Sequence, residues 1–244
     1  MTPPASSSSP AAYIGDTLIR VESASRTYVT GEVEIPALSE VSLTVSQGEF
    51  TAVAGPSGSG KSTLLNLISG LDTPTAGAIY IAGRRVSDMT GTELSDFRRD
   101  HMGFIFQSYN LIPVLSVTEN VEYIMLLQGV PAAERRSRVE EALELVALAG
   151  ISSRRPDQLS GGQQQRVAIA RAMVSQPNLI LADEPTANLD SATGSALVDM
   201  MRQINSERGV TFLFSTHDIM IMERARRLVT LRDGRIDNDE VRNE

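Results

Sequence analysis

The chain has 244 residues, of which 41% are hydrophobic and 21% charged, a composition typical of a globular protein with one large domain or two closely joined domains. Its formal net charge of −8, with no basic block, argues against nucleic acid as the main partner. The absence of cysteine excludes disulfides, cysteine-bound metals and a thiol nucleophile, and two histidines are too few for a histidine-built metal site. No apolar stretch reaches the ~18 residues of a membrane-spanning helix, so we expect a soluble, cytoplasmic chain.

Strands dominate the prediction from residue 18 to residue 107. Residues 18–21 and 41–45 alternate between apolar and polar side chains, which predicts half-buried strands. Residues 50–54 form a mostly apolar run that predicts a buried strand, and residues 78–83 predict a strand that ends in a turn. Before them, residues 1–12 are rich in serine, proline and alanine and lack the features of a signal peptide. We expect residues 1–17 to be a disordered tail.

A glycine-rich segment follows the buried strand and fits the P-loop pattern: Gly55, four residues, then Gly60-Lys61-Ser62. Such a loop turns consecutive N–H groups toward phosphate oxygens, and the helix predicted over 63–70 adds the positive end of its dipole. Lys61 can reach the β- and γ-phosphates, and the Ser62 hydroxyl can hold Mg²⁺. A flexible Gly/Ser loop is the alternative, but it rarely has the strand, Lys, Ser and helix in place. We therefore expect a nucleoside triphosphate to bind Gly55, Ser57, Gly58, Ser59, Gly60, Lys61, Ser62 and Thr63.

Helical patterns replace the strands over residues 108–178. Ser116 and Glu119 have the spacing of a capping box, and apolar residues then recur at helical spacing over 139–146, up to a stop at Gly150. In residues 159–163, Ser160 and two glycines precede a helix predicted over 163–175. A hydroxyl, closely approaching N–H groups and a helix dipole suit a second phosphate-binding surface, and a simple serine-capped helix is the alternative.

Strands return from residue 179 to residue 236. The apolar runs 179–182 and 211–215 predict strands covered on both faces, and residues 228–236 predict a closing hairpin. Asp183 and Glu184 directly follow the first run, at the edge of a parallel sheet where ligands bind. Asp183 could hold Mg²⁺ through water, and Glu184 could orient and deprotonate the attacking water. The alternative is a helix-capping or turn carboxylate.

Two further polar residues end predicted strands. Gln107 follows residues 103–106 and could reach Mg²⁺ or the attacking water, whereas the alternative is a plain turn glutamine. His217 follows the strand that begins at residue 211 and could hydrogen-bond the γ-phosphate, whereas a lone histidine is usually structural. With Glu184, these two complete the expected catalytic set, and Ser62, Gln107 and Asp183 form the expected Mg²⁺ site.

In this order the motifs resemble those of the ATPase subunits of ABC transporters, from about residue 18 to residue 236. Tyr28 resembles the aromatic residue that stacks on adenine, residues 55–62 the Walker A loop and Gln107 the Q-loop. Residues 179–184 resemble the Walker B strand, residues 187–190 the D-loop and His217 the switch histidine. The ABC signature is matched by Leu159, Ser160, Gly161, Gly162 and Gln163.

The resemblance implies an α/β fold: a P-loop NTPase core over 18–107 and 179–236, made of a mixed sheet flanked by helices with an N-terminal antiparallel β part. An all-helical subdomain over 108–178 is inserted into it, and an acidic tail over 237–244 follows it. The resemblance also implies a head-to-tail dimer around two ATP molecules. Residues 160–163 of one subunit would close on the γ-phosphate held by Lys61 of the other.

Residues 104–122 look like the branch of lipoprotein-release and macrolide-exporter ATPases, and residues 31–38 and 155–158 agree. That branch implies separate membrane permease subunits, no nucleic acid, and a place on the cytoplasmic face of the cell membrane. The apolar stretch 111–127 would border the groove for the coupling helices of those subunits, with core packing as the alternative. Two other functions stay open: an ATPase that signals through membrane subunits without transport, and a soluble ABC ATPase.

Overall fold

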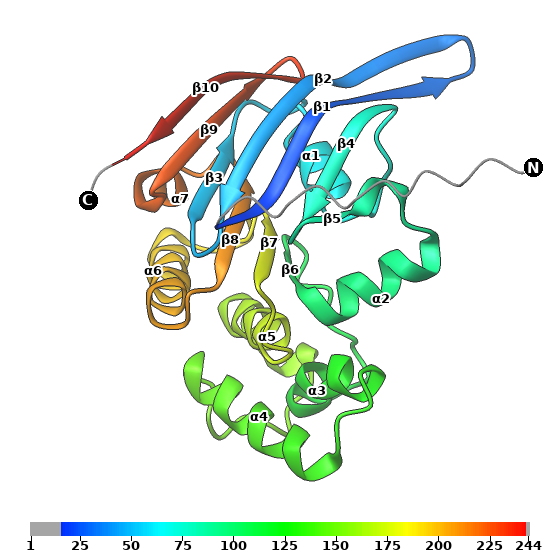
Figure 1. Cartoon of the computed structure of the whole chain (residues 1–244). Coiled ribbons are helices and arrows are strands. Elements are labelled where there is room, and N and C mark those ends of the chain that lie inside the picture. Colours follow the sequence, from blue (N-terminus) through cyan, green and yellow to red (C-terminus); the bar gives the residue numbers. More distant parts are fainter. Residues whose placement is uncertain (1–15, 243–244) are drawn as a thin grey trace, which may run out of the picture.

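Two sheets organise residues 16–242, the part of the chain that the computed structural model describes (Figure 1). The larger sheet has the order β10-β9-β3-β8-β7-β6, in which β10 is antiparallel to β9 and all other neighbours are parallel. Its strands are β3 (Phe50–Ala54), β6 (Met102–Phe106), β7 (Leu179–Asp183), β8 (Thr211–Thr216), β9 (Arg227–Arg232) and β10 (Arg235–Val241). The smaller sheet is antiparallel, with the order β2-β1-β4-β5. Its strands are β1 (Thr17–Thr30), β2 (Val33–Ser46), β4 (Ala76–Ile81) and β5 (Arg84–Arg85).

Both faces of the larger sheet are covered, as the uniformly apolar runs of β3, β7 and β8 predict. On one face, Phe50, Phe212 and Phe214 pack in a core with helices α3 to α6. On the other, Val53 and Leu213 pack with α1 and with the antiparallel sheet. Helix α1 therefore lies between the two sheets. The helices are α1 (Lys61–Ile68), α2 (Gly91–His101), α3 (Val117–Leu127), α4 (Ala132–Leu145), α5 (Gly161–Met173), α6 (Ser191–Arg208) and α7 (Ile219–Arg224), with short 3₁₀ turns at Val86–Asp88 and Pro156–Gln158.

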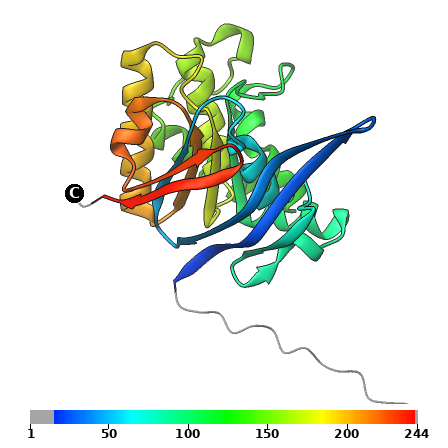
Figure 2. The ribbon, with the colours of Figure 1, turned by 90° about the horizontal axis from the view of Figure 1, so that it is seen from above.

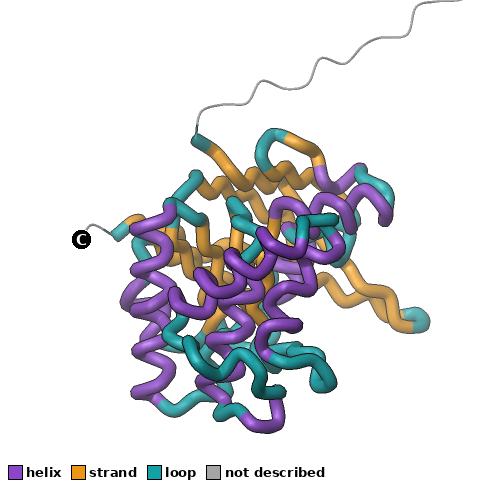
Figure 3. The backbone as a smooth tube through the Cα atoms, turned by 90° about the horizontal axis from the view of Figure 1, so that it is seen from below, coloured by secondary structure: helices purple, strands orange, loops and turns teal. Residues whose placement is uncertain are grey.

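The chain between β6 and β7 is helical and lies at one end of the molecule, in front of the strands when seen from below (Figure 3). The capping box predicted at Ser116 and Glu119 is confirmed, and Ser160 and Gln163 form a second one. The Ser116 hydroxyl accepts from the Glu119 N–H at the start of α3, and the Ser160 hydroxyl accepts from the Gln163 N–H at the start of α5. Each cap satisfies an N–H group that the helix leaves unpaired. Among residues 16–242, no helix combines the length and the apolar character needed to cross a bilayer.

Three elements differ from the sequence expectations. Strands β1 and β2 run beyond the short alternating segments to form a long hairpin whose outer half projects from the body (Figure 2). Helix α2 lies in the region 18–107, which was expected to be rich in strands, at a place where no helix was predicted. Strand β10 continues to Val241, so the expectation of an acidic tail from residue 237 is wrong for 237–241: this segment pairs with β9. Residues 1–15 of the expected N-terminal tail lie outside the described residues.

Candidate nucleotide-binding site

Four adjacent parallel strands end at the same edge of the larger sheet, and each leads into a segment that the sequence singles out. In spatial order they are β3, β8, β7 and β6. Gly55 follows β3, His217 follows β8, Asp183 ends β7 and Gln107 follows β6. The carboxyl ends of parallel strands are where open α/β sheets bind ligands. The topology therefore brings together residues that are far apart in the sequence.

The glycine-rich loop after β3 wraps closely against the hairpin. Gly60, with φ = 101°, precedes α1, and a Cβ built on it would lie 2.6 Å from the carbonyl oxygen of Ala37. Only glycine fits this close approach in a left-handed conformation. Helix α1 then begins at Lys61 without a side-chain cap, which leaves its first N–H groups and its dipole for an anion.

The Lys61 side chain lies across this loop. It is only 7% exposed, and its ammonium donates to the carbonyl oxygens of Gly55 at 2.8 Å and Pro56 at 3.0 Å. A cation held at this point faces any phosphate that the loop binds. Beside it, the Ser62 hydroxyl donates to the Asp183 carboxylate at 3.1 Å. These are two of the oxygen ligands that Mg²⁺ prefers.

Glu184 is held from two neighbouring strand ends. Its N–H donates to the carbonyl oxygen of Ser215 at 2.8 Å, and its backbone has φ = 46°. Its carboxylate oxygen Oε1 lies 2.7 Å from Nδ1 of His217. The side chain of Glu184 is 15% exposed and that of His217 is 70% exposed. A carboxylate fixed in this way can accept a proton from water. Because it contacts the exposed imidazole of His217, a change of its charge would alter the hydrogen bonding of that histidine.

Gln107 lies in a turn that other segments hold in place. The side-chain amide of Asn188 donates to the Gln107 carbonyl oxygen at 2.9 Å. Arg171 of α5 donates to the carbonyl oxygens of Tyr109, at 2.8 Å, and Asn110, both of which have a positive φ. Burial lowers the pKa of Arg171. From the sequence, Asn188 was expected only as part of the D-loop-like residues 187–190, and Arg171 was not expected here, because only long-range contacts reveal how they hold this turn.

These residues surround a cavity of about 610 Å³. Nine of the residues predicted from the sequence line it, together with Ala37 and Pro56. Asp183 adjoins the cavity through Ser62, and Gly55 adjoins it through Lys61. Ser59, beside them in the loop, is buried. The nine are Ser57, Gly58, Gly60, Lys61, Ser62, Thr63, Gln107, Glu184 and His217.

The family comparison agrees with this geometry: the sequence model described as "ABC transporter" matches residues 38–187, from β2 through the strand that carries Asp183. The chain belongs to the ABC transporter family. It is 49% identical to an uncharacterised ABC transporter ATP-binding protein of Thermotoga maritima, over 88% of this chain and 92% of that protein. It is 47% identical to the macrolide export ATP-binding/permease protein MacB of Rhodopseudomonas palustris, over 86% of this chain but 32% of MacB.

Among solved structures, the chain resembles the dimeric ABC transporter cassette MJ0796, a protein of Methanocaldococcus jannaschii. The TM-score is 0.86 at 43% identity, over 93% of this chain and all of that one. A second MJ0796 structure is a post-hydrolysis dimer bound to ADP and phosphate, with a TM-score of 0.86. The expected α/β P-loop fold is therefore confirmed. The chain is an ATP-binding ABC cassette with ATPase activity, and membership of a transporter is supported over the other functions left open by the sequence.

The signature segment of the cassette lies outside the cavity. Ser160, Gly161, Gly162 and Gln163 form the N-terminus of α5, and none of them lines the cavity around Lys61. A Cβ built on Gly161 would lie 2.8 Å from the Tyr109 hydroxyl, and one built on Gly162 would lie 2.5 Å from Cγ2 of Thr193. Any larger residue would push these neighbours apart. Because the two glycines have no side chains, the backbone N–H groups of this segment stay accessible to a ligand.

Tyr28 also lies outside the residues that line the cavity. It is part of strand β1 in the projecting hairpin, beyond the strand predicted at residues 18–21. Its hydroxyl donates to Asp72 at 2.8 Å, and the residue is 37% exposed.

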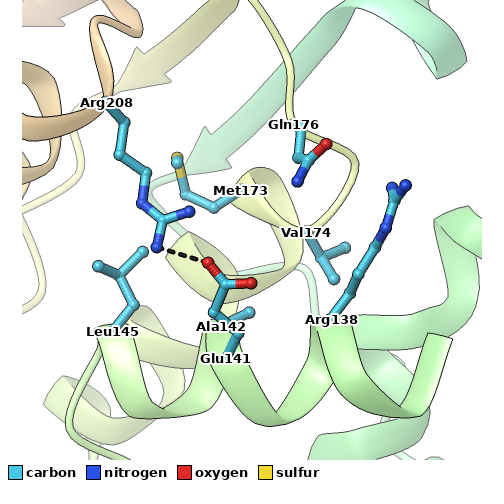
Figure 4. A pocket seen from close by; sticks show the side chains of 8 residues that line it. All are labelled: Arg138, Glu141, Ala142, Leu145, Met173, Val174, Gln176 and Arg208. Atoms are coloured by element: carbon cyan, nitrogen blue, oxygen red, sulfur yellow. Dashed lines mark ion pairs between the residues drawn. The ribbon is translucent and has the colours of Figure 1, made fainter. Parts of the chain in front are cut away.

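Among the hollows that lie away from the nucleotide cavity, two involve the helical segment between β6 and β7. The first, of about 20 Å³, lies between α4, the end of α5 and the end of α6, where Arg208 and Glu141 form an ion pair at 2.7 Å (Figure 4). It is too small for a ligand larger than water. We therefore regard it as part of the packing between α4, α5 and the end of α6. The second, of about 250 Å³, is a mostly apolar groove lined by residues of β6, α3 and α5, among them Phe104, Tyr123 and Arg171.

Proposed function

We propose that this cassette hydrolyses ATP in a head-to-tail dimer of two copies and drives separate membrane permease subunits. One observation carries the proposal: Lys61, Gln107, Glu184 and His217 line one cavity, whereas residues 160–163 of the same chain form the N-terminus of α5 and do not line it. A helix N-terminus that begins with two glycines and has a serine hydroxyl beside it suits a phosphate. In a single copy, this surface has no nucleotide to bind. A second copy, turned head to tail, would supply one.

In this proposal each residue has a distinct task. Lys61 and the N–H groups at the start of α1 hold the β- and γ-phosphates. Glu184 orients the attacking water and accepts its proton, and Gln107 positions that water from the end of the adjacent strand β6. His217, in contact with Glu184, donates a hydrogen bond to the γ-phosphate. Ser160, Gly161, Gly162 and Gln163 of the second copy stabilise the charge on the γ-phosphate.

A magnesium ion fits this site. Ser62 and Asp183 supply two hard oxygen donors that already meet at 3.1 Å, and Gln107 lies in the same cavity. Residues 16–242 contain no cluster of three or more acidic or histidine side chains that could hold a metal ion. Magnesium in nucleotide sites needs no such cluster, because it takes most of its ligands from phosphates and water. Bound there, the ion would neutralise phosphate charge.

The membrane subunits are proposed from the family and from one surface. The groove beside α3 is lined by apolar side chains, and the neighbouring Leu126 and Leu127 are 46% and 56% exposed. An amphipathic helix from a permease would cover such a groove. MacB, a macrolide exporter by name, joins cassette and permease in one chain. We propose a lipoprotein-release or export function for this cassette, at the cytoplasmic face of the cell membrane.

The proposed dimer is tested by size-exclusion chromatography with ATP. Glu184→Gln should bind ATP without consuming it and elute as a dimer. Adding Ser160→Arg should leave ATP binding intact and abolish the dimer, because a long cation would occupy the place of the γ-phosphate. Ser137→Arg, on the exposed face of α4, is the matched control and should still dimerise. An ATP-dependent dimer in the Glu184→Gln/Ser160→Arg protein would refute the head-to-tail arrangement.

A further inference from the structure

One carboxylate joins the projecting hairpin to the loop that follows α1. Asp72 accepts from the Tyr28 hydroxyl at 2.8 Å and from Nε of Arg26 at 2.9 Å, both on Oδ2. Its other oxygen lies 2.7 Å from a terminal guanidinium nitrogen of Arg26. Such a two-point contact between guanidinium and carboxylate is directional as well as strong. Two side chains of β1 are thus held by one residue of another segment.

Asp72 is itself held in place. Its N–H donates to the carbonyl oxygen of Asn66 at 3.1 Å, and its Oδ1 accepts from the N–H of Thr73 at 2.7 Å. The Asp72 and Arg26 side chains are 21% and 26% exposed, so water competes only in part for their contact. Asn66 belongs to α1, the helix that begins at Lys61. The backbone of Asp72 is therefore anchored to the helix that begins at the phosphate-binding lysine, and its carboxylate is fixed by the next residue.

The same contacts engage the hydroxyl and one face of the Tyr28 ring. The guanidinium carbon of Arg26 lies 4.7 Å from the ring centroid, so a cation covers one face. The hydroxyl is bound to Asp72, and the residue as a whole is 37% exposed. A ring fixed at its hydroxyl and on one face can offer only the other face. That face is suited to stacking on a planar base.

The hairpin ladder places this ring near the nucleotide cavity. Ala37 of β2 lines the cavity, and the adjacent Pro36 pairs with Thr27 of β1. Tyr28 is the next residue along that strand. A triphosphate bound through Lys61 would extend its nucleoside end toward the hairpin.

We propose that Asp72, acting with Arg26, is a positioning residue that holds Tyr28 in the orientation needed to stack on the adenine of ATP. The inference rests on the proposed function, ATP hydrolysis by this cassette, and on the resemblance that implies stacking of Tyr28 on the adenine of that ATP. The contacts of Asp72 connect the Tyr28 ring to α1. The distance between the ring that stacks on the adenine and the helix that binds the phosphates is therefore fixed. Asp72 contributes to affinity for the base and leaves affinity for the phosphates alone.

Calorimetry with two ligands tests this division. The dissociation constants of ATP and of inorganic tripolyphosphate, each with Mg²⁺, are measured for Tyr28→Ala, Asp72→Ala and Asp72→Asn. Tyr28→Ala should weaken ATP binding about 5- to 100-fold, the range expected for one stacked base. Asp72→Ala should weaken it about 3- to 30-fold by releasing the ring. Both variants should bind tripolyphosphate like the unaltered protein, and Asp72→Ala should add nothing in the Tyr28→Ala background.

Controls separate the outcomes. Asp96→Ala, which breaks an ion pair with Arg99 on the exposed face of α2, should change neither constant. Asp72→Asn keeps the size of the side chain, so it reports on charge if Asp72→Ala fails to fold. An equal loss of ATP and tripolyphosphate affinity, or unchanged ATP affinity in both Asp72 variants, would overturn the inference. If Tyr28→Ala leaves ATP affinity unchanged, the stacking role assigned to Tyr28 fails, and the role of Asp72 fails with it.

Discussion

The backbone of Glu184 has φ = 46°, a left-handed conformation that costs a non-glycine residue about 1–3 kcal/mol. The surrounding strands maintain it, because the Glu184 N–H is bound to Ser215 of the neighbouring strand β8. This conformation holds the carboxylate next to His217 at the strand ends. At the residue scale, the site therefore combines a strained backbone with a fixed carboxylate. A substitution that changes only the Glu184 side chain should lower the rate of hydrolysis more than it lowers the stability of the fold.

Glu184→Gln is the first residue-scale prediction. It keeps the shape of the side chain but removes the base, so ATP should still bind while kcat falls by about 10²–10⁴-fold, the usual contribution of a general base. Phosphate release under saturating ATP measures the rate, and calorimetry measures binding. Glu140→Gln, on the exposed side of α4, is the control. Near-normal hydrolysis by Glu184→Gln would contradict the role of Glu184.

Lys61 offers a second test at this scale because it is the only lysine in the sequence. Lys61→Ala should abolish tight ATP binding, since it removes the cation that meets the phosphates. In the unaltered protein, an amine-selective reagent can modify only Lys61 and the N-terminal amine. ATP should protect Lys61 and leave the N-terminus reactive, as measured by mass spectrometry of peptides. Equal labelling of Lys61 with and without ATP, or unchanged affinity in Lys61→Ala, would argue against this contact.

At the scale of elements, the sequence predicts best where local pattern and burial agree. The apolar runs of β3, β7 and β8 and the caps of α3 and α5 are local signals, and the structure contains each of them. Helix α2 also has such a signal, since Thr90 and Glu93 form a capping box. That box was not among the features predicted from the sequence. The order of β3, β8, β7 and β6 explains why the four motifs meet at one edge.

The elements that the sequence did not predict depend on partners far along the chain. The outer parts of β1 and β2 are largely exposed, and their pairing comes mainly from each other. Strand β10 is acidic and exposed, and it is held by pairing with β9 and by the ion pair of Asp239 with Arg227 at 2.7 Å. Asp72 and Arg171 act through contacts of the same long range. No local periodicity reports such contacts.

Asp239 gives a prediction for acid stability. Its hydrogen bond to Arg227 lowers the pKa of the Asp239 carboxyl below its ordinary value. The unfolded chain therefore binds this proton more readily than the folded chain, so the stabilisation is complete above the unfolded pKa of about 3.9 and is lost as pH falls through the folded pKa. Asp239→Asn should flatten the fall of the urea midpoint below about pH 4. Asp237→Asn, on the same strand, is the control. If, below about pH 4, the urea midpoint of Asp239→Asn falls as steeply as that of the unaltered protein, the ion pair of Asp239 with Arg227 does not stabilise the fold.

At the scale of the whole molecule, the signature segment and the nucleotide cavity belong to one chain without meeting in it. Hydrolysis in the proposed dimer then requires two cassettes. The rate per cassette should therefore depend on the fraction of cassettes that are present as dimers. In a dilution series of the isolated protein at saturating ATP, specific activity should fall as the protein is diluted below its dimer dissociation constant, because association follows mass action. Ser160→Arg should stay nearly inactive at every concentration, whereas Ser137→Arg should follow the unaltered protein. A specific activity that is constant on dilution while the protein elutes as a monomer would show that one copy hydrolyses ATP alone.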